Sequence, residues 1–431
     1  MREMKDSGIE WVGAIPQDWQ LSKIGSLYTQ RNEKVYDKNY QPLSVTMQGI
    51  LPQLATAAKT DDGDNRKLVR VGDFAINSRS DRRGSCGISP LDGSVSLINI
   101  ILTPRTAMHP GYYNWLFHTT LFADEFYKWG HGIVADLWTT HWQEMKSITV
   151  PVPEYAEQER IAAFLDAECA EIDTVLEKTR ASIEEYKKLK QAVITQVVTK
   201  GIRGDRPMKN SGIEWIGDIP AEWKVASIGR FCFVTKLAGF EFTNDMMSNI
   251  QDSGDIPIVR AQNIKMGKFI NNISEFIPYR ISQKLERCAL NRKCLIITFI
   301  GAGIGEVAIF NEPKRYHLAP NVAKIVINVG MEHFVTEEYL LYFLMSFAGQ
   351  EEINKIKKAT AQPSLSMGTI RSIKMVLPDS IEEQSEIVSY LDMRCASIDA
   401  LIAKKQQYLI EIENYKKSLI YEYVTGKKEV V

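Results

Sequence analysis

The sequence lacks the residue patterns that many catalytic and metal sites require. It contains no G-x-x-x-x-G-K-[ST] loop, so ATP hydrolysis of the P-loop type is not supported. None of its 16 prolines is followed by a second proline, which excludes the N/D/S-P-P-Y/F loop that amino-methyltransferases need. Its six histidines form no H-x-x-x-H or H-E-x-x-H pair, and its six cysteines form no C-x-x-C pair. These absences predict a chain without a catalytic or metal site of its own.

Long apolar runs and a secretion signal are lacking as well. The longest apolar runs, Cys294–Gly305 and Tyr339–Gly349, are too short to span a bilayer. The start of the chain, Met1–Glu10, is charged and has no apolar stretch of the kind that directs secretion. We therefore expect a cytoplasmic chain that does not enter a membrane and whose cysteines are reduced.

The chain also lacks a large excess of charge of either sign. It has 52 Lys and Arg against 53 Asp and Glu, which excludes a uniformly basic nucleic-acid binder. Residues 26–147 and 230–372 are nevertheless net positive, whereas residues 148–202 and 373–431 are net negative. Because 431 residues exceed a single core, we expect several domains, with any nucleic-acid contact in the basic segments.

Internal repetition is the strongest feature that the sequence does have. Met4–Gly25 and Met208–Gly229 are closely similar, and each contains two tryptophans on either side of an Ile-Pro pair. Gln158–Thr199 and Gln384–Thr425 form a second similar pair that aligns without gaps. The chain is therefore a tandem duplication whose ends stayed alike while its middles diverged.

Each repeat ends in a stretch that is typical of one long helix. Ala156–Thr199 contains neither Pro nor Gly, and its apolar residues recur at spacings of three and four. A single helix of this length is unstable alone, so we expect the two copies to pair as an antiparallel intramolecular coiled coil. A solitary helix and an intermolecular zipper remain alternatives. The predicted seam consists of Ile161, Leu165, Ile172, Val175, Ile183, Tyr186, Leu189 and Val193 in the first copy and of Ile387, Leu391, Ile398, Leu401, Tyr408, Ile412, Tyr415 and Leu419 in the second.

The middles have the pattern of mixed globular modules. Short β-rich runs between turn clusters predict strands, which in the first middle include Phe74–Asn77 and Val95–Leu102. Amphipathic helices are predicted at Tyr112–Lys128 and Glu337–Lys358. The predicted fold class is therefore α+β, with two mixed α/β modules in tandem duplication joined by the two long helices. In the second middle the predicted strands are Ile256–Arg260, Cys294–Ile300, Glu306–Phe310 and Val322–Val329.

Polar clusters on predicted loops of the two middles are candidates for contact with DNA. Arg can bind guanine through two hydrogen bonds, and Asn or Gln can bind adenine in the same way in the major groove. The simpler interpretation of any one cluster is a solvated loop. The candidates are Thr46, Gln48, Arg66, Lys67, Ser78, Arg79, Arg82 and Arg83 in the first middle and Arg260, Gln262, Asn263 and Lys265 in the second.

One glycine motif allows a different interpretation. Phe299–Gly303 matches the F-x-G-x-G segment that holds S-adenosylmethionine in amino-methyltransferases. The same glycines suit a tight hairpin between two apolar strands. Since the companion proline loop is absent, we favour the hairpin.

The repeated segments resemble those of one protein family. The Ser7–Trp19 and Ser211–Trp223 segments, and the Pro153–Asp166 and Pro378–Asp392 segments with their Glu-Gln pairs, are similar to the specificity subunits of type I restriction–modification systems. The resemblance covers essentially the whole chain.

The resemblance implies a DNA specificity subunit with no active site. It implies two target-recognition domains (1–150 and 207–375), each of which reads half of a bipartite site in double-stranded DNA. Two long helical segments (151–206 and 376–431) would space these domains and dock partner proteins. The implied partners are two methyltransferase subunits and two restriction–translocase subunits, and S-adenosylmethionine, ATP and Mg are expected on those partners. Base-contacting residues do not transfer, because recognition domains differ between members.

Two other functions are consistent with the residues alone. The chain could be a coiled-coil scaffold whose modules bind proteins, or a stand-alone DNA adenine methyltransferase. DNA binding that depends on salt would argue against the first, and failure to bind S-adenosylmethionine would argue against the second.

Overall fold

The computed structural model describes residues 2–54, 65–132, 138–358 and 364–430 of the chain. These residues form two compact units. Unit 1 comprises Met1–Arg180 and Gln406–Val431, and unit 2 comprises Ala181–Lys405. The long helices α5 (Tyr155–Lys200) and α11 (Ile381–Val424) each contribute residues to both units. No helix among the described residues is long and apolar enough to cross a membrane.

Unit 1 contains a four-stranded antiparallel sheet in the order β10-β9-β12-β4. Smaller sheets pair β8 with both β11 and β5, β6 with β7, β13 with β3, and β1 with β2. The strands are β1 (Met4–Asp6), β2 (Ala14–Pro16), β3 (Gln20–Lys23), β4 (Tyr28–Arg31), β5 (Lys34–Val35), β6 (Leu43–Thr46), β7 (Gly49–Pro52), β8 (Arg66–Val69), β9 (Phe74–Asn77), β10 (Cys86–Ile88), β11 (Gly93–Ser96), β12 (Asn99–Pro104) and β13 (Thr149–Val152). The helices are α1 (Ile24–Leu27), η1 (Ser80–Arg82), α2 (Pro110–Phe117), α3 (Thr120–Lys128) and α4 (Trp142–Met145).

Unit 2 contains a four-stranded sheet in the order β17-β26-β23-β24 and a second sheet in the order β21-β18-β25-β22. Its strands are β14 (Met208–Asn210), β15 (Asp218–Pro220), β16 (Lys224–Ser227), β17 (Cys232–Lys236), β18 (Ile256–Val259), β19 (Ile264–Lys265), β20 (Lys268–Phe269), β21 (Phe276–Ile277), β22 (Ala289–Leu290), β23 (Cys294–Thr298), β24 (Val307–Phe310), β25 (Tyr316–Leu318), β26 (Val322–Ile327) and β27 (Lys374–Leu377). Its helices are η3 (Ile228–Arg230), α6 (Gly239–Glu241), η4 (Phe242–Met246), η5 (Met247–Asn249), η6 (Ala261–Asn263), α7 (Tyr279–Lys284), η7 (Glu286–Cys288), α8 (Glu337–Met345), α9 (Phe347–Lys358) and α10 (Met367–Ser372).

The four-stranded sheets of the two units have the same order. Reading β4, β12, β9 and β10 across unit 1 corresponds to reading β17, β26, β23 and β24 across unit 2, and all these pairs are antiparallel. Each unit also pairs the strand that follows its second repeat tryptophan with the strand that precedes its long helix, as β3 with β13 and β16 with β27. The fold is therefore mixed α+β, as predicted, and its sheet pattern occurs twice.

Each of the two predicted amphipathic helices is broken in the middle. Thr119 separates α2 from α3, since its hydroxyl donates to the Leu116 carbonyl and accepts from the Phe122 N–H. Ser346 separates α8 from α9 in the same way, with its hydroxyl bonded to the Phe343 carbonyl and the Gly349 N–H. A hydroxyl that bonds the local backbone caps a new helix, which explains why one predicted helix becomes two.

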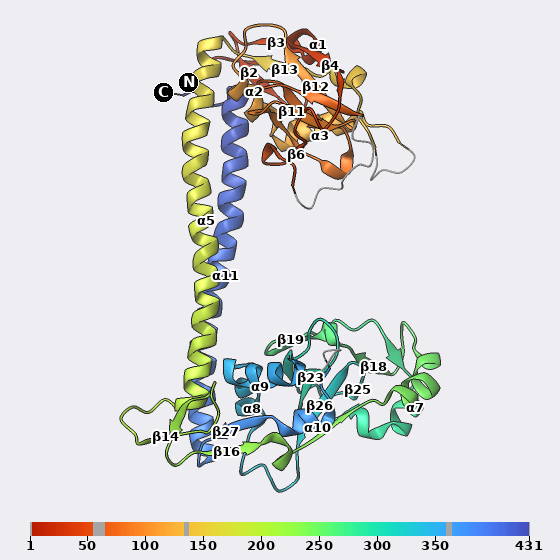
Figure 1. Ribbon diagram of the computed structural model, residues 1–431, viewed down its shortest axis with the longest axis vertical. Helices are drawn as coiled ribbons and strands as arrows, with labels where there is room; N and C mark the ends of the chain where they lie inside the picture. The colour runs from red at the N-terminus through yellow and green to blue at the C-terminus, as the bar shows by residue number, and fades with distance from the viewer. Residues whose placement is uncertain (1, 55–64, 133–137, 359–363, 431) are drawn as a thin grey trace. The chain divides into compact units, whose positions relative to one another are not determined.

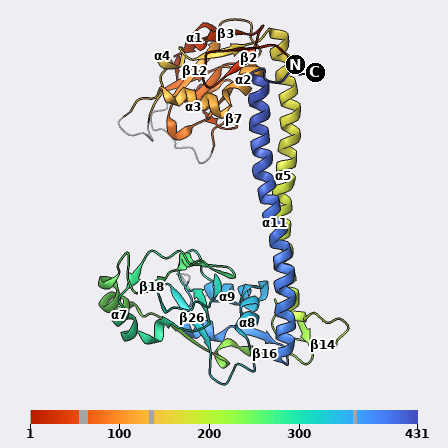
Figure 2. The same ribbon diagram turned by 180° about the vertical axis from the view of Figure 1, so that it is seen from behind.

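In unit 2, α8 lies between the four-stranded sheet and the long-helix segments, as Figure 2 also shows from behind. The Tyr339 hydroxyl on α8 is within 3.0 Å of both the Val198 carbonyl on α5 and the Val376 carbonyl on β27. In unit 1 the Tyr112 hydroxyl on α2 donates to the Val424 carbonyl on α11 at 2.8 Å. Each unit therefore buries the carboxyl end of one long helix beside the amino end of the other.

Within each unit, segments of α5 and α11 lie side by side (Figure 1). In unit 1, Lys416 pairs with Asp173 at 2.6 Å and Arg180 pairs with Glu413 at 2.6 Å. In unit 2, Lys190 pairs with Asp399 at 2.6 Å. The pair Arg203–Glu386 follows in unit 2 at 2.7 Å. Arg203 lies just beyond the end of α5. In both units the partner number on α11 falls as the number on α5, or on the residues that directly follow it, rises, so the segments are antiparallel.

The predicted seam is wrong at five positions. Ile161, Leu165, Ile183, Ile387 and Leu391 are buried. Val175 and Leu189 on α5 and Leu401, Tyr408 and Tyr415 on α11 are instead between 38% and 54% exposed.

The inward positions of α11 that replace them include two lysines. Ile402, Lys405, Leu409 and Lys416 are less exposed than the predicted residues beside them. The Lys405 Nζ lies 5.7 Å from the centre of the Tyr186 ring, and Lys416 is ion-paired with Asp173. A lysine can bury its aliphatic stem while its charged group keeps a partner. Because the prediction relied on apolar spacing alone, it chose the residues beside these lysines and not the lysines themselves.

Candidate nucleic-acid interface

A cavity of about 590 Å³ in unit 1 gathers several of the residues predicted to contact DNA. It lies between the β6–β7 hairpin, the η1 turn and the turn that joins β11 to β12. Thr46, Arg66, Arg82 and Arg83 line it, although the first two come from different strands and the arginine pair from the turn after β9. The fold therefore brings separate polar clusters of the first middle to one site.

Arg82 is the most available cation of this cavity. Its side chain is 69% exposed, and the nearest acidic atom is an Asp81 oxygen at 3.7 Å. Arg83 is more constrained, because it is hydrogen-bonded to Asp124 and its guanidinium lies 5.8 Å from the centre of the Tyr127 ring. A guanidinium with free N–H groups at the edge of a cavity can donate two hydrogen bonds to guanine or pair with a phosphate.

Three predicted residues use their polar groups inside unit 1. The Arg66 side chain donates to the Ser94 hydroxyl and the Ser94 carbonyl, each at 2.9 Å, and burial lowers the pKa of its guanidinium. The Ser78 hydroxyl donates to the Ile98 carbonyl. The Lys67 ammonium donates to the Asn99 carbonyl at 2.7 Å, and burial lowers its pKa. These bonds correct the expectation that Arg66, Lys67 and Ser78 present free donors to DNA.

The other three candidates of unit 1 lie at turns. The Thr46 hydroxyl closes the β6–β7 turn by donating to the Gly49 carbonyl at 2.9 Å and accepting from the Gln48 N–H at 3.1 Å. Gln48 itself is exposed at this turn. Arg79 is exposed directly after β9, and its backbone pairs with that of Thr139. The structure therefore leaves the Gln48, Arg79 and Arg82 side chains exposed on unit 1.

Asn99 is a residue of this cavity that sequence reasoning missed. Its Nδ2 donates to the Ser96 carbonyl at 2.9 Å, whereas its Oδ1 is buried without a hydrogen-bond partner. It lines the cavity beside Asn77, to which it is paired across β9 and β12. An unpaired buried acceptor costs free energy, so a ligand donor that reaches it is favoured. The signal available in the sequence was an asparagine inside the apolar run Val95–Leu102.

In unit 2, two residues of the predicted cluster, Asn263 and Arg260, use their side chains for bonds within the protein. Asn263 is buried, with its Oδ1 accepting from the Arg260 N–H and its Nδ2 donating to the Ile270 and Asn272 carbonyls. The Arg260 guanidinium is ion-paired with Glu275, with Nε 2.6 Å from the carboxylate. Asn263 therefore shapes the loop, which corrects its prediction as a base-contacting residue.

Gln262 and Lys265 remain exposed in unit 2. Lys265 and Lys268 face each other across the β19–β20 hairpin. The Lys265 Nζ is 3.7 Å from Glu306, and the structure gives Lys268 no ion pair among the described residues. Like charges directly opposite each other repel, so an anion beside this hairpin is favoured.

The Phe299–Gly303 motif forms a hairpin. β23 and β24 pair antiparallel on either side of it, with Ile297 opposite Val307. Gly301 and Gly305 have φ of 101° and 94°, a region that side chains rarely adopt. The turn therefore explains Gly301 and Gly305, and the hairpin is the interpretation that we favoured from the sequence.

No group of three or more His, Cys, Asp or Glu side chains among the described residues is placed so that it could hold a metal ion.

All six cysteines are buried. Burial raises the pKa of the Cys294 thiol to about 12 and that of Cys169 to about 11. Such thiols stay protonated near neutral pH and are poor nucleophiles.

Comparison with known proteins finds the same resemblance. Residues 220–414 match the model of the type I restriction modification DNA specificity domain. The MjaVIII specificity subunit of Methanocaldococcus jannaschii is 24% identical, over 96% of this chain and 94% of that protein. The EcoKI specificity subunit of Escherichia coli K12 is 21% identical, over 96% of this chain and 90% of that protein. Over most of its length the chain is therefore similar to the specificity subunits of type I restriction enzymes.

Solved structures share the fold of this chain. A chain solved in work on complex assembly and conformational transition of the type I R-M system superposes with a TM-score of 0.73. Its sequence is 14% identical, and the match covers 96% of this chain and 99% of that chain. The HsdS subunit from Thermoanaerobacter tengcongensis gives a TM-score of 0.51 at 16% identity, with 96% and 98% covered.

This similarity puts the exposed polar groups in context. Sequence-specific recognition of DNA requires hydrogen-bond donors and acceptors that can reach base edges. Among the predicted residues, Gln48, Arg79 and Arg82 of unit 1 and Gln262 and Lys265 of unit 2 are exposed, whereas Asn99 lines the cavity of unit 1 with a buried, unpaired oxygen.

Proposed function

We propose that each unit reads one half of a bipartite site in double-stranded DNA. The observation that carries this proposal is the repeated sheet order with different polar groups on it. After β9 the chain continues Ser78-Arg79, whereas after β23 it continues Phe299-Ile300. Two similar scaffolds with different side chains can address two different short sequences.

The proposed recognition domains are 1–150 and 207–375, and the proposed long helical segments are 151–206 and 376–431. We propose that α5 and α11 form an antiparallel intramolecular coiled coil, supported by the ion pairs within each unit. These acidic segments dock two methyltransferase subunits and two restriction–translocase subunits. The near repetition of the chain suits two copies of each partner, because similar surfaces recur.

In this proposal the chain catalyses nothing by itself. Methylation of adenine and cleavage occur on the partner subunits, which bind S-adenosylmethionine, ATP and Mg. The absence of the methyltransferase proline loop from the sequence supports this division of labour. The chain supplies the sequence preference and positions the partners on the DNA, in the cytoplasm.

The decisive experiment is to sequence methyladenine in DNA from cells that express the chain with its methyltransferase partner. A bipartite methylated motif is expected, and exchanging residues 26–147 for those of a relative should change only one half of it. Methylation with no dependence on the chain would contradict the proposal. A purified chain that binds partner proteins but shows no salt-dependent binding to duplex DNA would favour the protein scaffold instead.

A further inference from the structure

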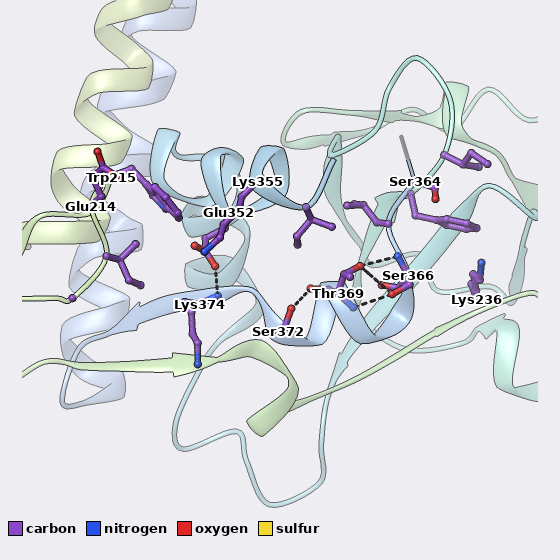
Figure 3. Close-up of a pocket in the computed structure, with 16 residues that line it drawn as sticks. Glu214, Trp215, Lys236, Glu352, Lys355, Ser364, Ser366, Thr369, Ser372 and Lys374 are labelled. Atoms are coloured by element: carbon purple, nitrogen blue, oxygen red, sulfur yellow. Dashed lines mark hydrogen bonds between the residues drawn. The ribbon is translucent and has the colours of Figure 1, made fainter. Parts of the chain in front are cut away.

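A second cavity, of about 920 Å³, takes no part in the proposed reading of DNA. It lies in unit 2 between α9, α10 and the segment Gly212–Trp215, with Phe299 and Lys236 at the ends of strands β23 and β17. Figure 3 shows Trp215, Glu352 and Lys355 at one end of the cavity and Lys236 at the opposite end. Its size is within the range of small-molecule sites.

Two buried groups at the first end lack the partners that burial requires. The Trp215 Nε1 is buried and has no hydrogen-bond acceptor. Glu352 is only 7% exposed, and among the described residues its carboxylate accepts a single hydrogen bond, from the Lys374 N–H at 2.8 Å. An unpaired indole N–H and an incompletely bonded carboxylate both cost free energy. A ligand that offers an acceptor and a donor here is therefore favoured.

Two lysines add positive charge without an acidic partner. The Lys355 Nζ lies 5.2 Å from the centre of the Trp215 ring. The Lys236 Nζ lies 4.2 Å from the centre of the Phe299 ring. Within the described parts of the chain neither lysine forms an ion pair with Asp or Glu. Each ammonium therefore keeps its capacity to pair with an anion.

Unit 1 satisfies the corresponding carboxylate internally. Glu125 on α3, the counterpart of Glu352, accepts from the Trp129 Nε1 at 3.0 Å and pairs with Lys128 at 3.6 Å. In unit 2 the residue in the place of Trp129 is Ile356, which has no side-chain donor. Trp11 is the counterpart of Trp215, and its ring centre lies 5.8 Å from that of Phe122. Of these two tryptophans, it is Trp215 whose Nε1 is buried without a partner.

We propose that this cavity binds a nucleotide. A base with an exocyclic amino group donates to Glu352 and accepts from the Trp215 Nε1, and the phosphate pairs with Lys236 at the other end. Lys355, over the indole at the base end, adds positive charge to the site as a whole. Two sources share this chemistry, namely a free nucleotide and a nucleotide turned out of a DNA strand.

Calorimetric titration of the full chain with adenosine monophosphate and with a short single-stranded adenine oligonucleotide tests the proposal. Binding of either ligand is expected, and Trp215→Phe and Lys236→Met should each weaken it about tenfold. Thymidine monophosphate, which has no exocyclic amino group, should bind about tenfold more weakly than the adenine nucleotide. Trp11→Phe and Lys128→Met in unit 1, at the counterparts of Trp215 and Lys355, are the controls, and they should leave the affinity unchanged.

The two ligands distinguish the sources. Binding of the monophosphate indicates a free nucleotide, and binding of the oligonucleotide alone indicates a nucleotide of DNA. The proposal is overturned if neither ligand binds, or if affinity is the same in the Trp215→Phe and Lys236→Met chains as in the control chains. Circular dichroism of every variant checks that unit 2 is folded, and Glu352→Gln provides a further variant if Trp215→Phe does not fold.

Discussion

The Trp223 Nε1 donates a hydrogen bond to the Glu383 carboxylate at 3.1 Å. The same relationship occurs in unit 1, where the Trp19 Nε1 donates to Glu157 at 2.9 Å. An arginine is also part of the site in unit 2. The guanidinium of Arg206 pairs with Glu383 and lies 5.7 Å from the centre of the Trp223 ring. The second tryptophan of the repeated start thus anchors the first turn of the following long helix in its own copy.

The first prediction concerns this anchor. Glu383→Gln should destabilise unit 2 by about 3 kcal/mol, because it leaves the Arg206 charge without its least exposed partner. Urea unfolding, followed by hydrogen exchange at the first turn of α11, measures the loss. Glu222→Gln removes the other carboxylate near Arg206, which is 41% exposed, and should cost less than about 1 kcal/mol. Equal losses in the two variants would show that Glu383 has no special role.

The second prediction concerns Arg82. Arg82→Ala should weaken binding to DNA that carries the first half-site by about 1–3 kcal/mol and relax the preference at one base pair. Arg83→Ala should have a smaller effect, because Arg83 is already bonded to Asp124. Competition binding with variants of each half-site measures both. A uniform loss on all sequences with a flatter salt dependence would instead identify a phosphate contact. Arg70→Ala, at an exposed pair with Asp92, is the control.

The third prediction tests the antiparallel register of α5 and α11 in unit 2. Lys190→Asp should place two carboxylates together and destabilise the pair by up to about 1 kcal/mol, since Asp399 is 55% exposed. Adding Asp399→Lys should recover most of that loss by restoring an opposite-charge pair. Thermal unfolding of the single and double variants gives the coupling energy. Absence of recovery in the double variant would contradict this pairing. Lys187→Asp, at a pair within α5, should not respond to Asp399→Lys.

The fourth prediction concerns pH. Burial, and then the charges of Arg315 and Lys324, lower the pKa of His317 from 6.5 to about 4. Between these values the unfolded chain binds a proton that the folded chain excludes, so stability falls as pH decreases from about 6.5 toward 4. The loss should reach about 3 kcal/mol. His317→Gln should remove most of this slope, whereas the exposed His333→Gln should keep it. Unfolding in urea across this pH range measures it, and a slope that persists in His317→Gln would assign it elsewhere.

Much of the fold followed from the sequence. Strand runs such as Phe74–Asn77 are where the spacing predicted them, because a short buried strand is encoded by its own residues. The predicted run Val95–Leu102 is wrong as one strand, since it is divided between β11 and β12, which belong to different sheets. The long helices also begin and end within a few residues of the predicted bounds, since nothing inside them breaks a helix. Gly201 and Gly426, with φ of 76° and 71°, follow their carboxyl ends, where a left-handed residue is favoured.

The candidate site could be predicted from the sequence only in part. Sequence clusters identified Arg82 and Gln262 as polar and accessible, but they could not separate these from Arg66 and Asn263, which are buried. An arginine or asparagine in a loop has the same local signature whether it bonds its own backbone or a base. Only the carbonyls brought near it by distant strands decide between the two.

The sequence by itself determined the duplication, the α+β class and the resemblance to specificity subunits, because these depend on residue order and local spacing. Only the tertiary structure decided which residues of each long helix lie inward. Leu401, Tyr408 and Tyr415 are exposed, whereas Lys405 and Lys416 lie inward. The reason is that Tyr186 and Asp173 on α5 provide partners for those two ammonium groups, and no property of α11 alone encodes a partner on another helix.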